Sequence, residues 1–330
     1  TALDLTTAES YLVLAATFST FVIFGYPCGL IIKAIGYKKT MILSFLFFAI
    51  GLYLFIPSAE NQSFAMFLLA SFVSGIGNTM LQAAVNPYIT ILGPLESAAT
   101  RMSMMGIANK AAWAIAPIFL GVFLNLGDVQ LDDIKLPFYF ISGIFVLLGV
   151  LVAFVPLPEV KAEGEDESDE EASSSYASTK TSIWQFPHLL LGLVSLLCYV
   201  GVETLAMASI VDYAKSIGLA DPQIYTSYTV IGMVAGYLVG VFFIPKYLSQ
   251  ERAMFICAII GVISSLLVVF LPVHISIWFV ALLGLANSLM WPALWPLAMK
   301  DLGKFTKTGS SLLVMAIVGG AIFPLLFGWL

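Results

Sequence analysis

Apolar runs about as long as a bilayer is thick recur along nearly the whole of this 330-residue chain. A helix needs about 20 consecutive apolar residues to cross the hydrocarbon core of a membrane. Hydrophobic residues make up 60% of the sequence and charged residues only 10%, whereas a soluble domain carries roughly a quarter charged residues. The composition therefore excludes an ordinary soluble domain, and we expect an all-α polytopic membrane protein.

Ten such runs predict ten membrane-spanning helices. They leave room only for short loops and for one longer polar stretch. The predicted spans are residues 11–32, 41–56, 64–92, 102–126, 137–155, 185–212, 225–244, 253–271, 275–298 and 309–330.

The longer polar stretch, residues 156–184, separates five spans from five. Within it, residues 159–171 hold eight acids and one lysine, which accounts for the formal charge of -6. A segment this polar cannot bury a hydrophobic core, so we expect a disordered linker. In the simplest interpretation it is only a solvated spacer. The predicted domains are an N-terminal helical half (1–155), the acidic linker (156–184) and a C-terminal helical half (185–330).

The distribution of Lys and Arg predicts the orientation in the membrane, because short loops rich in them stay in the cytoplasm. Alternate loops differ sharply in this respect: eleven basic residues fall on one side, and only Lys135 and Lys215 fall on the other. This pattern places the acidic linker in the cytoplasm. It places both ends of the chain on the opposite side.

The two halves also share residues at matching places, about 210 positions apart, which indicates an internal repeat. The matched pairs are Gly25 with Gly236, Tyr26 with Tyr237, Gly29 with Gly240, Gly75 with Gly284, Asn78 with Asn287, Ala84 with Ala293, Pro87 with Pro296, Pro117 with Pro324 and Gly121 with Gly328. Six helices lie in each period, an even number that preserves the direction of crossing.

Two parallel six-helix repeats joined by a long cytoplasmic loop are the arrangement of a major facilitator fold. Only ten helices are visible, five on each side of the linker. We therefore expect the first and last helices of that fold to be missing from this chain.

Polar side chains inside the spans point to a ligand site, because a polar group in hydrocarbon usually faces a cavity or another helix. Spaced four residues apart, they lie on one face of a helix. Amides both donate and accept hydrogen bonds and indoles stack on sugar C–H faces, so this set suits a neutral polyhydroxylated ligand. The predicted substrate-binding residues are Asn78, Gln82, Asn86, Asn109, Trp113, Asn287 and Trp291.

A purely structural interpretation of these residues stays open. Amides often bond between the helices of membrane bundles. Tryptophans, Trp295 especially, are common in cores and interfacial belts.

Glu203 is the one carboxylate deep within an apolar span. An intramembrane acid is a functional candidate by default, and burial favours its neutral form, a property that a proton-coupled carrier exploits. We expect Glu203 to take part in coupling or to bind sugar; the alternative is a hydrogen-bonded structural glutamate. Lys110 lies nearer a helix end, where it could snorkel to the cytoplasmic face in a structural role.

These residues resemble the bacterial fucose, galactose and glucose proton symporters of the major facilitator superfamily over nearly the whole chain. The most specific parts of the likeness are Gln82, Asn86-Pro87-Tyr88-Ile89-Thr90, Leu92-Gly93-Pro94, Arg101, Asn109-Lys110, Tyr199-Val200-Gly201, Glu203, Trp291-Pro292, Lys300, Leu302-Gly303, Thr306-Lys307 and Gly309-Ser310-Ser311. Lys33, Gly36 and Lys38 resemble the basic loop that follows the second helix of the superfamily.

One departure bears on the substrate that the resemblance implies. The fucose branch has a carboxylate tied to proton coupling where this chain has Gln82. Glutamine there resembles the glucose and galactose branch instead.

The sequence thus predicts a secondary active transporter that imports a monosaccharide, glucose or galactose first, across a bacterial inner membrane by alternating access. We expect proton coupling, no cofactor, no metal, no nucleic-acid partner, and a monomer in the bilayer. One alternative keeps the fold but carries fucose or an amino sugar, or uses sodium. Another is a channel or membrane enzyme, but neither a filter repeat nor a cluster of catalytic side chains is visible.

Overall fold

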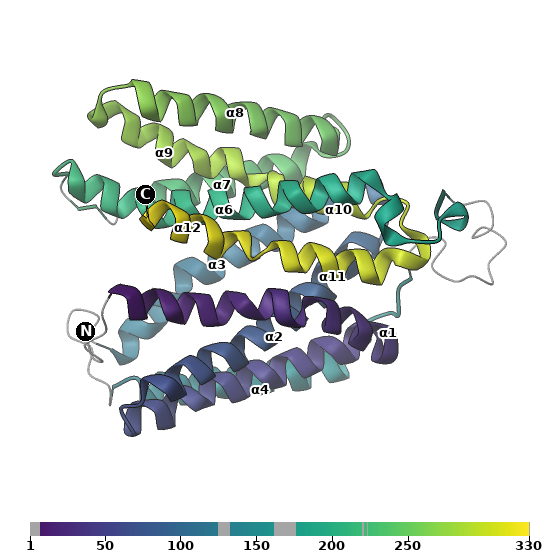
Figure 1. Ribbon diagram of the computed structural model, residues 1–330, viewed down its shortest axis with the longest axis horizontal. Coiled ribbons are helices and arrows are strands. Elements are labelled where there is room, and N and C mark those ends of the chain that lie inside the picture. Colours follow the sequence, from purple (N-terminus) through teal and green to yellow (C-terminus); the bar gives the residue numbers. More distant parts are fainter. Residues whose placement is uncertain (1–6, 125–132, 162–175, 220, 223, 330) are drawn as a thin grey trace. The chain divides into compact units, whose positions relative to one another are not determined.

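The structure is a computed structural model that describes residues 7–124, 133–161, 176–219, 221–222 and 224–329. Within these residues it is helical nearly throughout and contains no β-strand. The α-helices are α1 (Thr7–Glu60), α2 (Phe64–Ile91), α3 (Ala98–Phe123), α4 (Lys135–Phe154), α6 (Pro187–Ser216), α7 (Ile224–Phe243), α8 (Gln250–Phe270), α9 (Val273–Ser288), α10 (Met290–Met299), α11 (Thr306–Ala316) and α12 (Gly319–Trp329) (Figure 1). Short 3₁₀ turns are η1 (Leu95–Ser97), η2 (Tyr176–Thr179), η3 (Ile183–Gln185) and η4 (Gly303–Phe305).

Among the described residues, nine helical stretches are long and apolar enough to cross a membrane, so the all-α polytopic prediction is confirmed. The helix α1 accounts for two of the predicted spans. Its 54 residues would extend about 80 Å at 1.5 Å per residue, far more than a bilayer of about 30 Å. The chain bends at Gly36, whose φ of 81° and ψ of 172° favour glycine. In Figure 1, α1 turns back on itself, so its two arms run in opposite directions.

The predicted span 275–298 is a single crossing interrupted at Leu289, where α9 ends and α10 begins. Pro292 gives the physical reason. It has no N–H to donate, and its ring would clash with the carbonyl of Ser288 in a continuous helix. In the first turn of a new helix a proline is tolerated, and Pro292 lies in the first turn of α10.

The described helices gather into two compact units. The first contains Thr1–Tyr88, Trp113–Ile183 and Leu302–Val318, and the second contains Ile89–Ala112, Trp184–Asp301 and Gly319–Leu330. Each unit holds residues from both sides of the linker. The division into domains at 155 and 184 stays a prediction, and residues 162–175 of the acidic linker lie outside the described residues.

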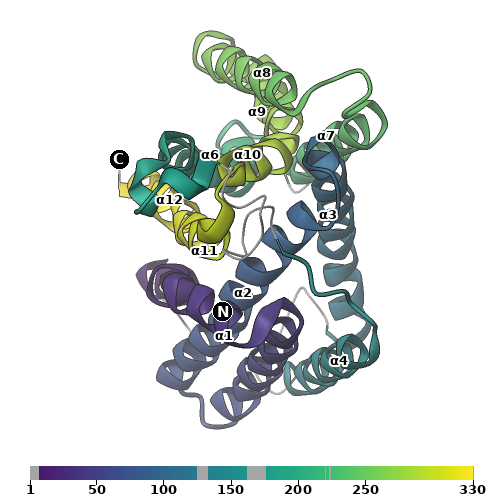
Figure 2. The ribbon, with the colours of Figure 1, turned by 90° about the vertical axis from the view of Figure 1, so that its right-hand side faces the viewer.

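In the first unit, α1 packs against α2 and α4. The hydroxyls of Thr20 and Thr79 lie 3.0 Å apart and join α1 to α2. The ring of Phe48 stacks on that of Phe145 with centroids 4.7 Å apart, which joins α1 to α4. Figure 2 shows α4 beside α1. These two contacts are a polar pair and an aromatic pair, and both kinds are common between packed helices in membranes.

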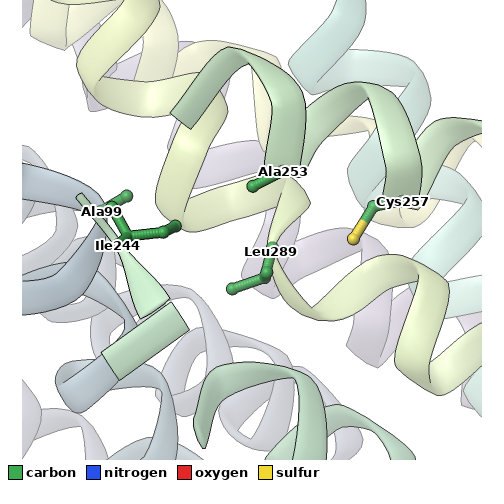
Figure 3. Close-up of a cluster of buried hydrophobic side chains, with 5 residues drawn as sticks. All are labelled: Ala99, Ile244, Ala253, Cys257 and Leu289. Atoms are coloured by element: carbon green, nitrogen blue, oxygen red, sulfur yellow. The ribbon is translucent and has the colours of Figure 1, made fainter. Parts of the chain in front are cut away.

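In the second unit, a buried apolar cluster joins four segments (Figure 3). It brings together the start of α3, the end of α7, the first turns of α8 and the break between α9 and α10. Its members are Ala99, Ile244, Ala253, Cys257 and Leu289.

The repeated glycines make equivalent close contacts, one in each unit. A Cβ on Gly29 of α1 would lie 2.8 Å from Cβ of Ser311 on α11. A Cβ on Gly240 of α7 would likewise collide with Oγ of Ser103 on α3. Small residues let helix backbones approach closely in membranes. The sequence repeat therefore corresponds to a repeated helix contact.

Candidate functional site

The predicted polar stripe of α2 lies in the first unit and contains an amide pair. Nδ2 of Asn86 donates to Oε1 of Gln82 at 2.7 Å and to the Gln82 carbonyl at 3.0 Å. Asn86 is fully buried, whereas Gln82 and Asn78 are half-buried. The buried amide thus fixes the orientation of the more accessible one.

Trp113, the other site residue predicted in the first unit, does not share this environment. It lies on α3 and its side chain is 54% exposed.

The remaining predicted residues lie in the second unit, where an aromatic platform forms around Trp291. Its ring stacks on Trp295 with centroids 5.2 Å apart and approaches Tyr199 of α6 at 6.4 Å. Trp295 is fully buried, and its Nε1 has no hydrogen-bond partner among the described residues. Trp291 is half-buried. Buried Trp295 therefore packs behind Trp291, and the half-buried ring of Trp291 is the more accessible surface of the platform.

The two predicted asparagines of this unit differ in accessibility. Asn287 is buried near the end of α9, whereas Asn109 on α3 is exposed. The break at Leu289 falls between Asn287 and Trp291, so these two residues do not share one continuous helix face.

The most strongly polar contact in the second unit is an ion pair inside two membrane spans. Nζ of Lys110 on α3 donates to Oε1 of Glu203 on α6 at 3.3 Å. The side chains are 8% and 18% exposed. Lys110 therefore neutralises Glu203 in the interior, and the expected snorkelling of Lys110 to the membrane surface is not observed. Ionisable residues within spans usually pair in this way.

Two tyrosines surround this ion pair. Tyr199 lies one turn before Glu203 on α6 and interacts electrostatically with its carboxylate. Tyr237 of α7 also interacts electrostatically with Glu203. Both tyrosines are buried. Glu203 thus pairs with one cation close to two buried tyrosines.

One face of α3 brings Lys110 to this position. The hydroxyl of Thr100 donates to the Ile244 carbonyl at 2.7 Å. Ser103 contacts Gly240 as described above. A Cβ on Gly106 would lie 2.7 Å from Cζ of Tyr237, so the ring rests directly against the helix backbone. These residues, three apart, form one stripe on α3, and Lys110 extends it by one turn.

The start of α3 is held by two further polar side chains. Gln250 accepts from the Ala99 N–H and donates to the Leu95 carbonyl, both at 3.0 Å. The Arg101 guanidinium donates to the carbonyls of Ile89, Thr90, Gly93 and Pro94 and to the Ser97 hydroxyl at 2.7–3.2 Å. Arginine suits this task because its planar fork offers five donors.

Sequence reasoning singled out Glu203 and Lys110 separately but missed their pairing, and it did not select Tyr199 or Tyr237. One signal was present. Tyr199 precedes Glu203 by four residues, which is the spacing of helix neighbours.

The described residues form a multi-pass membrane protein with an ion pair inside its spans. Ionisable residues in this position are typical of proteins that bind or transport polar ligands or ions. The Major Facilitator Superfamily model matches residues 1–329. The chain belongs to this superfamily of transporters, and it is therefore a transporter and not an enzyme.

Individual relatives extend the similarity. The chain is 32% identical to a glucose/galactose transporter of Brucella abortus biovar 1 (strain 9-941), over 97% of this chain and 78% of the relative. It is 25% identical to the L-fucose-proton symporter of Escherichia coli (strain K12), over 99% of this chain and 80% of the relative. The crystal structure of an E. coli fucose:proton symporter variant is similar with a TM-score of 0.85 at 24% identity, covering 98% of this chain and 84% of that chain. This structural likeness confirms the predicted fold.

Proposed function

We propose that the protein imports a monosaccharide, glucose or galactose first, together with a proton, by alternating access between its two halves. The observation that carries this proposal is the amide pair of α2. Gln82 is oriented by buried Asn86, and an amide fixed in this way offers both a donor and an acceptor to sugar hydroxyls.

The aromatic platform supports a sugar as ligand. A half-buried indole backed by a fully buried one, Trp291 on Trp295, gives a rigid apolar surface. Sugar C–H faces pack on such surfaces. Asn109 and Asn287 are proposed as further hydrogen-bonding residues, and Asn78 and Trp113 complete the proposed set.

The relatives support the choice of sugar. The Brucella abortus relative is named a glucose/galactose transporter. It is more similar in sequence to this chain than the L-fucose-proton symporter of E. coli is. Gln82 agrees with the glucose and galactose branch. We propose the bacterial inner membrane as the location, and the proton as the coupling ion, with Glu203 as the side chain that exchanges it.

The test is uptake of labelled monosaccharides into vesicles containing the purified protein. Glucose, galactose, fucose and an amino sugar are compared with a proton gradient, with a sodium gradient and with neither. We expect glucose or galactose to accumulate only with the proton gradient. Accumulation of fucose alone, or accumulation driven by sodium alone, would contradict the proposed substrate or ion, and no accumulation of any sugar would contradict the proposal as a whole.

A further inference from the structure

We propose that the indole N–H of Trp295 donates a hydrogen bond to a hydroxyl of the transported sugar when α10 bends at the break after α9. This inference rests on the proposed sugar-transport function and adds a residue to its binding site, since the packing of Trp295 by itself indicates only a supporting role. Three features of the second unit support it: a buried donor, a pair of offset rings and a repeated Trp-Pro pair.

Trp295 buries a donor that has no acceptor in the described part of the chain. Its side chain is fully buried, and Nε1 has no hydrogen-bond partner among the described residues. An indole nitrogen can only donate, and a buried one usually finds an acceptor because an unpaired donor is costly. A phenyl ring would fill the same apolar place without this cost. An indole is favoured here if Nε1 meets an acceptor during the transport cycle.

The position of this ring beside Trp291 favours the sugar as that acceptor. The two ring planes are inclined by only 30°, with centroids 5.2 Å apart. Since atoms in contact lie about 3.5 to 4.0 Å apart, the rings are offset sideways by roughly 3 to 4 Å. Part of Trp295 therefore extends beyond the edge of Trp291, the surface on which the sugar is proposed to pack. A water molecule would need further polar partners at this place, whereas the sugar is already held by Trp291.

A repeated Trp-Pro pair allows the movement that uncovers Trp295. Trp291-Pro292 recurs one turn later as Trp295-Pro296, and the break at Leu289 comes shortly before the first pair. Neither proline has an N–H to donate to the carbonyl four residues earlier. Helices bend where such backbone hydrogen bonds are missing. We therefore expect α10 to bend close to the two residues that bear its indoles.

The test compares the binding of a monosaccharide with the binding of its single-deoxy derivatives, each of which lacks one hydroxyl. Purified wild type, Trp295→Phe and the control Trp278→Phe are titrated with each derivative in competition with the labelled parent sugar. Trp278 lies on α9 in the same unit, is 52% exposed and contacts Tyr228 with ring centroids 5.3 Å apart. The control thus makes the same exchange of indole for phenyl at an exposed place.

We expect the wild type to bind one derivative about 5-fold to 150-fold more weakly than the parent sugar, because that derivative leaves Nε1 unpaired. Trp295→Phe should bind this derivative and the parent sugar with similar affinity, and Trp278→Phe should discriminate as the wild type does. A packing defect weakens the binding of all the sugars alike. Wild-type ratios in Trp295→Phe would therefore overturn the proposal, as expected if Nε1 meets only a water molecule.

A second measurement keeps the proposal testable if Trp295→Phe fails to fold. Wild-type protein is given an NMR isotope label on its indole nitrogens only, and the Trp295 resonance is assigned by replacing each other tryptophan in turn. Its N–H proton should move downfield with the parent sugar but not with the derivative that lacks the accepting hydroxyl. The same response to both would overturn the proposal.

The two proposals fail in different ways. Wild-type protein that binds no monosaccharide would refute the proposed function and this contact together. Wild-type protein that binds the sugar, with ratios unchanged in Trp295→Phe, would refute the contact alone.

Discussion

At the scale of single residues, Gln82 is the side chain through which the proposed sugar site can be tested most directly. Gln82→Ala removes a donor and an acceptor from the proposed site. A sugar hydroxyl left unpaired at this site costs about 1 to 3 kcal/mol, so affinity for the sugar should fall about 5-fold to 150-fold. Equilibrium binding of labelled sugar to purified protein measures the change.

The matched control for this prediction is Asn61→Ala. Asn61 is an exposed amide at the end of α1 that donates to the Pro57 carbonyl. Its removal should leave the affinity unchanged. If well-folded Gln82→Ala protein binds sugar as tightly as the wild type does, Gln82 is not part of the site.

Single residues were predictable from the sequence where they contrast with their surroundings, and their partners were not. Glu203 stands out because its neighbours along the chain are apolar, and Lys110 stands out for the same reason. Their pairing depends on the packing of two helices separated by 93 positions in the chain. No local spacing encodes such a contact, so Lys110 was interpreted as a surface-directed residue.

At the scale of elements, the repeated glycine contacts predict which helices tolerate a methyl group. Gly29→Ala places a Cβ 2.8 Å from Ser311, and overpacking of this kind costs about 1 to 3 kcal/mol. The melting temperature of the purified protein should fall. Gly143→Ala on α4, where nothing lies within 4 Å of the new Cβ, should raise it slightly through the better helix propensity of alanine.

A Gly29→Ala variant that melts no lower than the Gly143→Ala variant would contradict the close approach of α1 and α11. The same comparison applies to Gly240→Ala, whose Cβ would collide with Ser103.

The helices themselves followed from the lengths of the apolar runs, but their interruptions did not. The break at Leu289 has a local cause in Pro292, and the corresponding position of α2 is Ala83. The difference was visible in the sequence. Its effect was not predicted because a proline in a membrane helix can also be accommodated by a kink without a break.

At the scale of the whole molecule, the charge pattern predicts that the loop after α1 faces away from the cytoplasm and that residues 156–184 face it. Exposed Cys198 is first replaced by serine, and the other two cysteines are buried. A membrane-impermeant thiol reagent added to intact cells should then label Asn61→Cys. It should label Thr181→Cys only after the membrane is opened, and labelling of Thr181→Cys in intact cells would invert the topology.

Hydropathy along the chain predicted where the apolar helices of the described residues lie and in what order. It did not predict that residues on both sides of the linker would join in one compact unit, as α3 does with α7 in the contacts of Thr100 and Gly106. Such contacts depend on tertiary packing, which a linear pattern of apolar residues leaves open.

The interruption at Leu289 has a mechanical consequence. We expect the break between α9 and α10 to bend more readily than the continuous helix α2, because fewer backbone hydrogen bonds cross a break than span an intact helix turn. Asn287 and Trp291 stand on opposite sides of that break. We therefore expect a ligand that binds both residues to change the angle between α9 and α10.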